Sequence, residues 1–201
     1  MTGVRLICLD MDGTLLDDDH ATVPPRNVRA LRAAAERGAL VAIASGRSWS
    51  LLEEVADQVG AVGCAVLSNG ASVLDVGTGE WLYRSCLPEE TWRPLARLLL
   101  ARRLPFEVYC EGETLIQRDT FPSVLDCALS EEFRGVLRRH TLRPESLEEA
   151  LSGRAVEKFH IYRIPPEQRE AVRAEALACG PMTAATAFPG NLELTAPGVN
   201  K

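Results

Sequence analysis

Short apolar runs separated by helix-forming segments dominate the first 82 residues. The runs at residues 4–9, 39–44 and 64–67 have the length and composition of buried strands. A helical pattern lies between the first two runs, beginning at Pro25 and ending at Gly38. A strand, a helix and another strand make a βαβ unit, so the pattern predicts a parallel sheet in which residues 4–9 are a central strand buried on both faces.

Two further signals extend this first unit. The pattern Ser50-x-x-Glu53 is typical of a capping box and predicts that a helix starts there. Residues 72–76 and 80–83 flank a glycine-rich turn, which predicts a hairpin that leads out of the sheet.

From about residue 83 the pattern changes to alternating helical and strand-like segments, with no paired carboxylates or glycine-rich loop at the strand ends. The helical segments are 88–103, 121–139, 146–152 and 166–178, and the strand-like segments are 106–110, 114–117, 156–164 and 182–187. We therefore expect an α/β protein with a Rossmann-like parallel-sheet core at 1–82, an inserted α+β domain at 83–189, and a return to the core at 190–201.

The composition is that of an ordinary globular chain, with 201 residues, 46% hydrophobic and 25% charged. A formal net charge of −6 argues against a nucleic-acid partner, and no apolar run approaches the roughly 20 residues of a membrane helix. The six cysteines show no metal-ligand spacing, so we expect reduced thiols in a cytoplasmic protein. His20, His140 and His160 have no paired partner in the sequence, and we interpret them as loop, structural or surface residues.

The candidate chemistry begins with Asp10 and Asp12, which follow the first apolar run. In open α/β sheets the ligand crevice lies beyond the carboxyl ends of the strands, and these carboxylates stand at such an end. Two carboxylates this close repel each other unless a cation or a shared proton relieves them, and Mg²⁺ is the natural counter-ion. The alternative is a surface loop with two solvated aspartates.

The second and third apolar runs also end in small polar residues. Ser45, Gly46 and Arg47 offer a hydroxyl, an accessible backbone and a cation, which suit a phosphate. Alternatively, the serine only caps the next helix and the arginine is solvated. Asn69-Gly70 is first of all a turn signal, but it follows the third successive strand end.

These strand ends together resemble the motifs of one family. Asp10-Met11-Asp12-Gly13-Thr14 resembles the first motif of the haloacid dehalogenase-like phosphatases, in particular the Cof-type branch with a large inserted cap. Ser45-Gly46-Arg47 matches the second motif, and Asn69-Gly70-Ala71 matches a Cof-type Asn-Gly-Ala. Lys201, after a strand and a Pro-Gly turn, matches the lysine of the third motif. The alternative is an unremarkable lysine at a frayed terminus.

The resemblance implies a magnesium-dependent phosphatase that acts on a small phosphorylated metabolite, either a sugar phosphate or a phosphorylated cofactor, through an aspartyl-phosphate. Asp10 would be the nucleophile, Asp12 the general acid and base, and Lys201 the cation that neutralises Asp10 and the phosphoryl group. Asp10 and Asp12 would also bind Mg²⁺. The resemblance places substrate or phosphate contacts at Gly13, Thr14, Ser45, Gly46, Arg47, Asn69 and Gly70. The inserted domain would be the cap, which closes over the leaving group and selects the substrate.

The family continues with a strand ending in Gly-Asp and a further Asn-Asp, which complete the magnesium site and are not among these 201 residues. The resemblance therefore implies an incomplete fragment, weakly active or inactive, whose first strand forms an exposed apolar edge able to associate with another chain. Two other functions stay open: phosphoryl transfer within one molecule, as in the related phosphomannomutases, and a non-catalytic binding module that keeps the cap.

Overall fold

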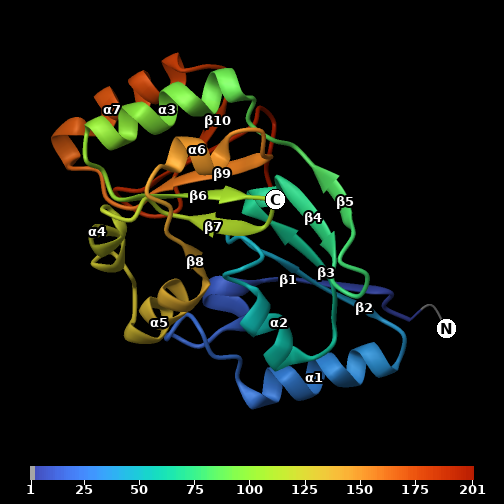
Figure 1. Cartoon of the computed structure of the whole chain (residues 1–201). Coiled ribbons are helices and arrows are strands. Elements are labelled where there is room, and N and C mark those ends of the chain that lie inside the picture. Colours follow the sequence, from blue (N-terminus) through green and yellow to red (C-terminus); the bar gives the residue numbers. More distant parts are fainter. Residues whose placement is uncertain (1–2) are drawn as a thin grey trace.

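Two β-sheets with helices packed on their outer sides make up the computed structural model, which describes residues 3–201 (Figure 1). The first sheet has five strands in the order β1-β2-β3-β4-β5. The strands are β1 (Leu6–Asp10), β2 (Leu40–Ala44), β3 (Val62–Leu67), β4 (Ser72–Asp75) and β5 (Trp81–Arg84). The first three strands are parallel, and β4 and β5 each run antiparallel to the strand before. The predicted α/β class with a parallel sheet is confirmed.

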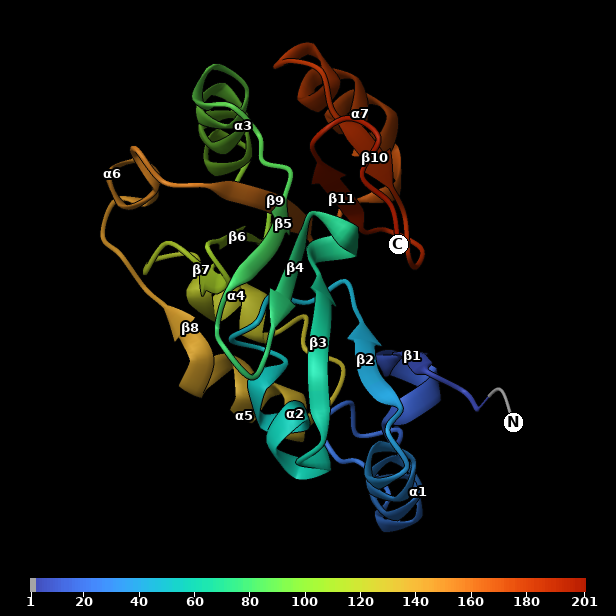
Figure 2. The same cartoon turned by 90° about the vertical axis from the view of Figure 1, so that its right-hand side faces the viewer.

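Helices α1 (Pro25–Glu36) and α2 (Glu53–Val59) cover one face of this sheet (Figure 2). Leu31 of α1 and Val55 of α2 pack with Ile43 of β2 in one apolar cluster. The helical residues that point inward recur at intervals of three and four, so their apolar stripe faces the sheet. This packing fixes the carboxyl ends of β1, β2 and β3 beside one another.

Within the described residues β1 pairs only with β2 and Leu6 is 56% exposed, so β1 is the exposed apolar edge that the resemblance implies and is not buried on both faces as the apolar run alone predicts. Two other local predictions for this sheet are wrong. The hairpin β4–β5 continues the sheet and does not leave it, because β4 pairs directly with β3. Ser50 does not cap α2, since its hydroxyl bonds Thr114 of the second sheet. Association through the β1 edge stays a prediction.

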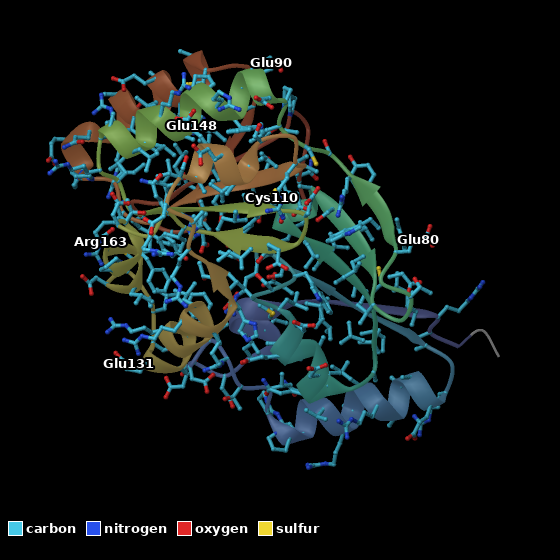
Figure 3. The ribbon with its side chains drawn as sticks, in the orientation of Figure 1. Glu80, Glu90, Cys110, Glu131, Glu148 and Arg163 are labelled. Carbon is cyan, nitrogen blue, oxygen red and sulfur yellow. The ribbon has the colours of Figure 1, made fainter. Side chains whose placement is uncertain are left out.

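The second sheet has six strands in the order β10-β11-β9-β6-β7-β8. The strands are β6 (Phe106–Cys110), β7 (Glu113–Leu115), β8 (Thr141–Leu142), β9 (Val156–Ile161), β10 (Thr183–Ala185) and β11 (Leu192–Thr195). Helices α3 (Glu89–Ala101), α6 (Leu147–Leu151) and α7 (Arg169–Ala178) cover its outer face. Glu148 of α6 lies beside α3 (Figure 3), where its carboxylate pairs with Arg93 and Arg97.

Alternation along these strands separates two chemically different faces. Phe106, Val108 and Leu194 pack under the helices, whereas Glu107 and Glu193 point to the opposite face. Because the pairing of β6 with β9 has a bulge, Glu157 does not follow this alternation. Its carboxylate accepts a hydrogen bond from the Ser68 hydroxyl at 2.9 Å. The polar face of the second sheet is therefore turned toward the first sheet.

The segment boundaries differ from those expected. The division at residue 83 cuts β5, which belongs to the first sheet, and strand β11 within the expected return at 190–201 pairs with β9 and β10 of the second sheet. The helix predicted over 121–139 is two helices, α4 (Phe121–Leu125) and α5 (Glu131–His140), and Ser130 caps the second. Across residues 3–201 we find no helix of the length and apolarity that a membrane crossing requires.

Candidate active site

The carboxylate of Asp10 lies at the carboxyl end of β1. The chain then turns through Met11–Leu15, and Gly13 with φ of +75° takes the left-handed conformation that lets it turn. Lys201 donates a hydrogen bond from its ammonium to Asp10 Oδ1 at 2.6 Å. Both side chains remain open to solvent, since Lys201 is 42% and Asp10 45% exposed. The first and last parts of the chain thus meet at the end of β1.

Gly70 positions the terminal segment that carries Lys201. Its φ is +94°, and a Cβ built there would lie 2.3 Å from the carbonyl oxygen of Asn200. Only glycine allows so close an approach at this backbone conformation. Ala71, Ala196 and Val199 form a small buried cluster beside it. Gly70 therefore supports the site by packing, and it does not line the cavity described below.

Asp12 is held by two partners that the chain itself supplies. The Arg47 guanidinium donates to Asp12 Oδ1 at 2.6 Å and to Oδ2 at 3.2 Å, and the His20 ring lies 3.0 Å from Oδ1. Burial acts to raise the pKa of Asp12, but the Arg47 and His20 contacts outweigh it and hold that pKa below its usual value. Arg47 also stacks on the Phe133 ring, 4.4 Å from its centroid. Arg47 is therefore paired with Asp12, and His20, which lies in a loop as expected, also contacts the Asp12 carboxylate.

The second and third strand ends are packed against the polar face of the second sheet. Lys158 of β9 is 1% exposed, and its ammonium donates to the carbonyl of Gly46 at 2.8 Å and to Glu193 Oε1 at 2.7 Å. Asn69, in the left-handed region at φ of +61°, donates to Glu193 Oε2 at 2.7 Å. A Cβ on Gly46 would lie 2.6 Å from Asn69 Oδ1, so a side chain at this position would displace the Asn69 amide from its place beside Glu193. Ser45, 1% exposed, accepts a hydrogen bond from the Arg47 amide at 3.2 Å.

A cavity of about 570 Å³ lies between the two sheets and joins these groups. Eight residues predicted from the sequence line it: Asp10, Asp12, Gly13, Ser45, Gly46, Arg47, Asn69 and Lys201. Thr14 and Gly70, also predicted, are not in its lining. The lining further includes residues that sequence reasoning missed, among them His20, Glu107, Tyr109, Phe133, Lys158, His160, Tyr162, Phe188 and Glu193. This volume is within the range of about 300–1,000 Å³ typical of small-molecule sites.

Oxygen ligands for a divalent cation are few in this cavity. Within residues 3–201 no three His, Cys, Asp or Glu side chains gather in a metal-binding group. The Asp12 carboxylate is committed to Arg47, which leaves the Asp10 carboxylate and main-chain carbonyls of the loop as candidate ligands. Because Mg²⁺ is commonly held by one or two carboxylates together with waters and substrate phosphate, Asp10 fits a weakly bound Mg²⁺.

The comparisons of this sequence with known proteins all point to one family. The sequence profile of haloacid dehalogenase-like hydrolases matches residues 7–201. The chain is 28% identical over 112 residues to a 5-amino-6-(5-phospho-D-ribitylamino)uracil phosphatase of Bacillus subtilis, covering 56% of this chain and 38% of that protein. It is 36% identical over 86 residues to an HMP-PP phosphatase of Serratia proteamaculans, covering 43% and 31%. The chain thus spans about a third of the length of these curated relatives.

Solved structures share the fold over nearly the whole chain. A haloacid dehalogenase-like hydrolase from Bacteroides thetaiotaomicron superimposes with a TM-score of 0.81 at 21% identity, covering 98% of this chain and 73% of that one. A haloacid dehalogenase-like hydrolase from B. subtilis gives a TM-score of 0.79 at 19% identity, covering 98% and 75%. At such identities the likeness concerns the fold alone.

Proposed function

The chain belongs to the haloacid dehalogenase-like hydrolases, and from this membership we propose that it is the nucleophile-bearing part of a phosphatase for small phosphorylated metabolites. The observation that carries the proposal is the pair formed by the Asp10 carboxylate and the Lys201 ammonium at the wall of a metabolite-sized cavity. The two curated relatives described above are named as phosphatases of phosphorylated metabolites, which supports this reaction class. The part that includes the second sheet is proposed to act as the cap over the leaving group.

Asp10 has the role of nucleophile in this proposal. Its carboxylate oxygen attacks phosphorus, the bond to the leaving oxygen breaks, and an aspartyl-phosphate forms that water then hydrolyses. Lys201 neutralises the charge of Asp10 and of the phosphoryl oxygens, because stabilisation of this transition state is mostly positioning and charge. Ser45 and the backbone around Gly13, which line the cavity, are proposed to hold phosphoryl oxygens.

Asp12 is proposed as the proton-transfer group. The Arg47 and His20 contacts hold the pKa of Asp12 below its usual value, so Asp12 is ionised and is in the form that accepts a proton from the hydrolytic water. Protonation of the leaving oxygen requires the neutral acid, so the Arg47 contact must loosen when Asp12 gains a proton. Mg²⁺, bound through the Asp10 carboxylate and the main-chain carbonyl of Asp12, would supply further positive charge to the phosphoryl group.

The test is the replacement Asp10→Asn, assayed with p-nitrophenyl phosphate and MgCl₂. We expect turnover to fall at least about a hundredfold, because an amide cannot replace the carboxylate nucleophile and the nearby Asp12 carboxylate is held by Arg47. Asp18→Asn, in the exposed loop outside the cavity, is the matched control and should leave turnover unchanged. An enzyme-excess format is used because the resemblance implies a chain that is weakly active or inactive. Turnover of Asp10→Asn within tenfold of a detectably active parent would refute Asp10 as the nucleophile.

A further inference from the structure

Helix α5 lies between strands β7 and β8 in the sequence, but it packs against segments that flank the first sheet. Figure 1 shows α5 apart from α3 and α7, which cover the second sheet. Phe133 of α5 belongs to one apolar cluster with Leu51 and Ala21, which lie in the segments that follow β2 and β1. At the end of α5, Arg139 pairs with Glu54 of α2 through two hydrogen bonds of 2.8 Å. The helix is therefore held against the loops at the carboxyl ends of the first two strands.

The Phe133 ring covers the guanidinium of Arg47. The central carbon of that guanidinium lies 4.4 Å from the ring centroid, and both side chains line the cavity. Phe133 is 8% and Arg47 7% exposed, so little water competes with the attraction between the cation and the ring. The same guanidinium donates to Asp12 Oδ2 through Nε and to Oδ1 through Nη2. Because the arginine fork both stacks on a ring and binds a carboxylate, Phe133 sets the orientation in which Arg47 holds Asp12.

Ser130 fastens the start of α5 to the loop at residues 17–22. Its hydroxyl accepts a hydrogen bond from the Phe133 amide at 2.9 Å, as the N-cap of α5, and donates its proton to the carbonyl of Asp19 at 2.5 Å. A hydroxyl has one proton and two lone pairs, so it makes both bonds at once. The backbone position of Phe133 is therefore tied to the loop that carries His20.

The contacts return to Asp12 through that loop. Arg47 Nη2 donates to the carbonyl of His20 at 2.9 Å, and the His20 ring lies 3.0 Å from Asp12 Oδ1. The network of contacts is therefore closed. It runs from Asp12 through Arg47 to α5, and from α5 through the loop back to Asp12. Because every member is held from two sides, a displacement of α5 also displaces the Asp12 carboxylate.

We propose that Phe133 and Ser130 are positioning residues, which hold the Asp12 carboxyl group in place for proton transfer to the leaving oxygen. Phe133 acts through Arg47, and Ser130 acts through the loop that carries His20. The inference rests on the proposed function, because that function assigns the proton transfer to Asp12.

The proton transfer gives the inference a chemical signature. As the bond from the Asp10 oxygen to phosphorus forms and the bond to the leaving oxygen breaks, the proton of the neutral Asp12 carboxyl moves to that leaving oxygen. A p-nitrophenolate departs as a stabilised anion and needs little of this proton, whereas a phenolate is more basic and needs it. A misplaced Asp12 therefore slows the reaction of phenyl phosphate more than that of p-nitrophenyl phosphate.

The first measurement reports the network directly and needs no turnover. Arg47 Nε–H donates to Asp12 Oδ2 at 3.2 Å, and its exchange with water is followed by NMR in isotope-labelled protein, where Arg47→Lys identifies the resonance by its loss. Phe133→Leu removes the ring, and Ser130→Ala removes both bonds of the hydroxyl. We expect exchange at least about tenfold faster in each, because the network opens more often. Phe133→Tyr keeps the ring and should exchange within about threefold of the parent.

Two matched controls remove the same kinds of contact elsewhere. Phe121 carries the guanidinium of Arg143 over its ring, 4.6 Å from the centroid, and Ser146 caps α6 by accepting a hydrogen bond from the Glu149 amide. Neither Phe121 nor Ser146 lines the cavity. Phe121→Leu and Ser146→Ala should therefore leave the exchange of Arg47 Nε–H unchanged. Circular dichroism checks that every variant is folded.

The second measurement tests the proton transfer. With enzyme in excess and MgCl₂ present, release of phenol from phenyl phosphate and of p-nitrophenol from p-nitrophenyl phosphate reports the first step alone. Phe133→Leu and Ser130→Ala should slow the reaction of phenyl phosphate at least about tenfold, and that of p-nitrophenyl phosphate no more than about threefold. Asp12→Asn, which removes the acid itself, should show the same preference more strongly. Phe133→Tyr should keep the rate of the parent with both substrates, and so should the two controls.

The outcomes separate this inference from the proposed function. If Asp12→Asn shows the substrate preference but the two α5 variants do not, or if they slow both substrates equally, the positioning role is overturned while the proposed function stands. If Asp12→Asn slows neither substrate in an active parent, the proposed role of Asp12 fails and the inference falls with it. In a parent too slow to assay, faster exchange in both α5 variants and in neither control still supports the positioning, and unchanged exchange overturns it.

Discussion

Replacing Lys158 by methionine tests how strongly the polar wall between the two sheets depends on one buried ion pair. The Lys158 ammonium is 1% exposed, and it donates to Glu193 at 2.7 Å and to the carbonyl of Gly46 at 2.8 Å. Burial lowers the pKa of Lys158. Burial also acts to raise the pKa of Glu193, but Lys158 outweighs it and holds that pKa below its usual value. Each charge therefore offsets the desolvation of the other.

The magnitude follows from leaving one of these charges alone. Removing one member of a buried ion pair costs about 3–5 kcal/mol, because the remaining charge is uncompensated. Methionine is close to lysine in volume, so we expect Lys158→Met to lower the free energy of unfolding by about 4 kcal/mol. Glu193→Leu should cost a similar amount, because it isolates the ammonium. Against the 5–15 kcal/mol typical of a folded protein, each loss is large.

The double variant Lys158→Met/Glu193→Leu removes both charges at once. The carbonyl of Gly46 and the amide of Asn69 still lose a partner each, which costs about 2 kcal/mol together. The double loss should therefore be far smaller than the sum of the single losses, with a coupling energy of about 3 kcal/mol or more between the two sites.

Urea denaturation at neutral pH, followed by circular dichroism, gives the free energy of unfolding for the parent, both single variants and the double variant. Arg118→Met is the control, because Arg118 and its partner Glu145 are 64% and 75% exposed, and its loss should stay within about 0.5 kcal/mol. A double variant that loses the full sum of the single losses would refute the reasoning, since it would show that the two charges do not compensate each other.

Two further predictions concern the backbone at the site and the acid limit of stability. Gly70→Ala should lower the free energy of unfolding by about 3 kcal/mol in thermal denaturation, because the new Cβ clashes with the Asn200 carbonyl. The control is Gly79→Ala, at a φ of +73° with nothing within 4 Å, which should lower it by only about 1 kcal/mol. Equal losses in the two variants would contradict this prediction. The Arg139 hydrogen bond lowers the pKa of Glu54 to about 2, so this carboxylate contributes stability above its usual pKa near 4.5, and the contribution is lost as pH falls toward 2. Glu54→Gln should therefore reduce the pH dependence of the free energy of unfolding between those two pH values. The reduction should be less than about 1 kcal/mol, because the Glu54–Arg139 pair is exposed. The same pH dependence in the variant and the parent would contradict this prediction.

The sequence alone was enough for the part of the site that is built from strand ends. Asp10, Ser45 and Asn69 each follow an apolar run, and consecutive parallel strands bring their carboxyl ends to one edge of a sheet. The pattern of runs is local, so the α/β class could be predicted without knowing any long-range contact. The burial of β1 could not be predicted in this way, because it depends on which strands pair beside it.

Only the tertiary structure decided the opposite wall of the cavity. Glu107, Lys158 and Glu193 lie on three strands far apart in the chain, and the register of β6, β9 and β11 brings their side chains together. The sequence shows a charged residue within each apolar strand, but alternation alone indicates only that one face of the strand is polar. Whether that face meets solvent or a second sheet is set by packing between distant segments. Lys158 and Lys201 are the only lysines in the chain, and tertiary contacts bring both into one cavity.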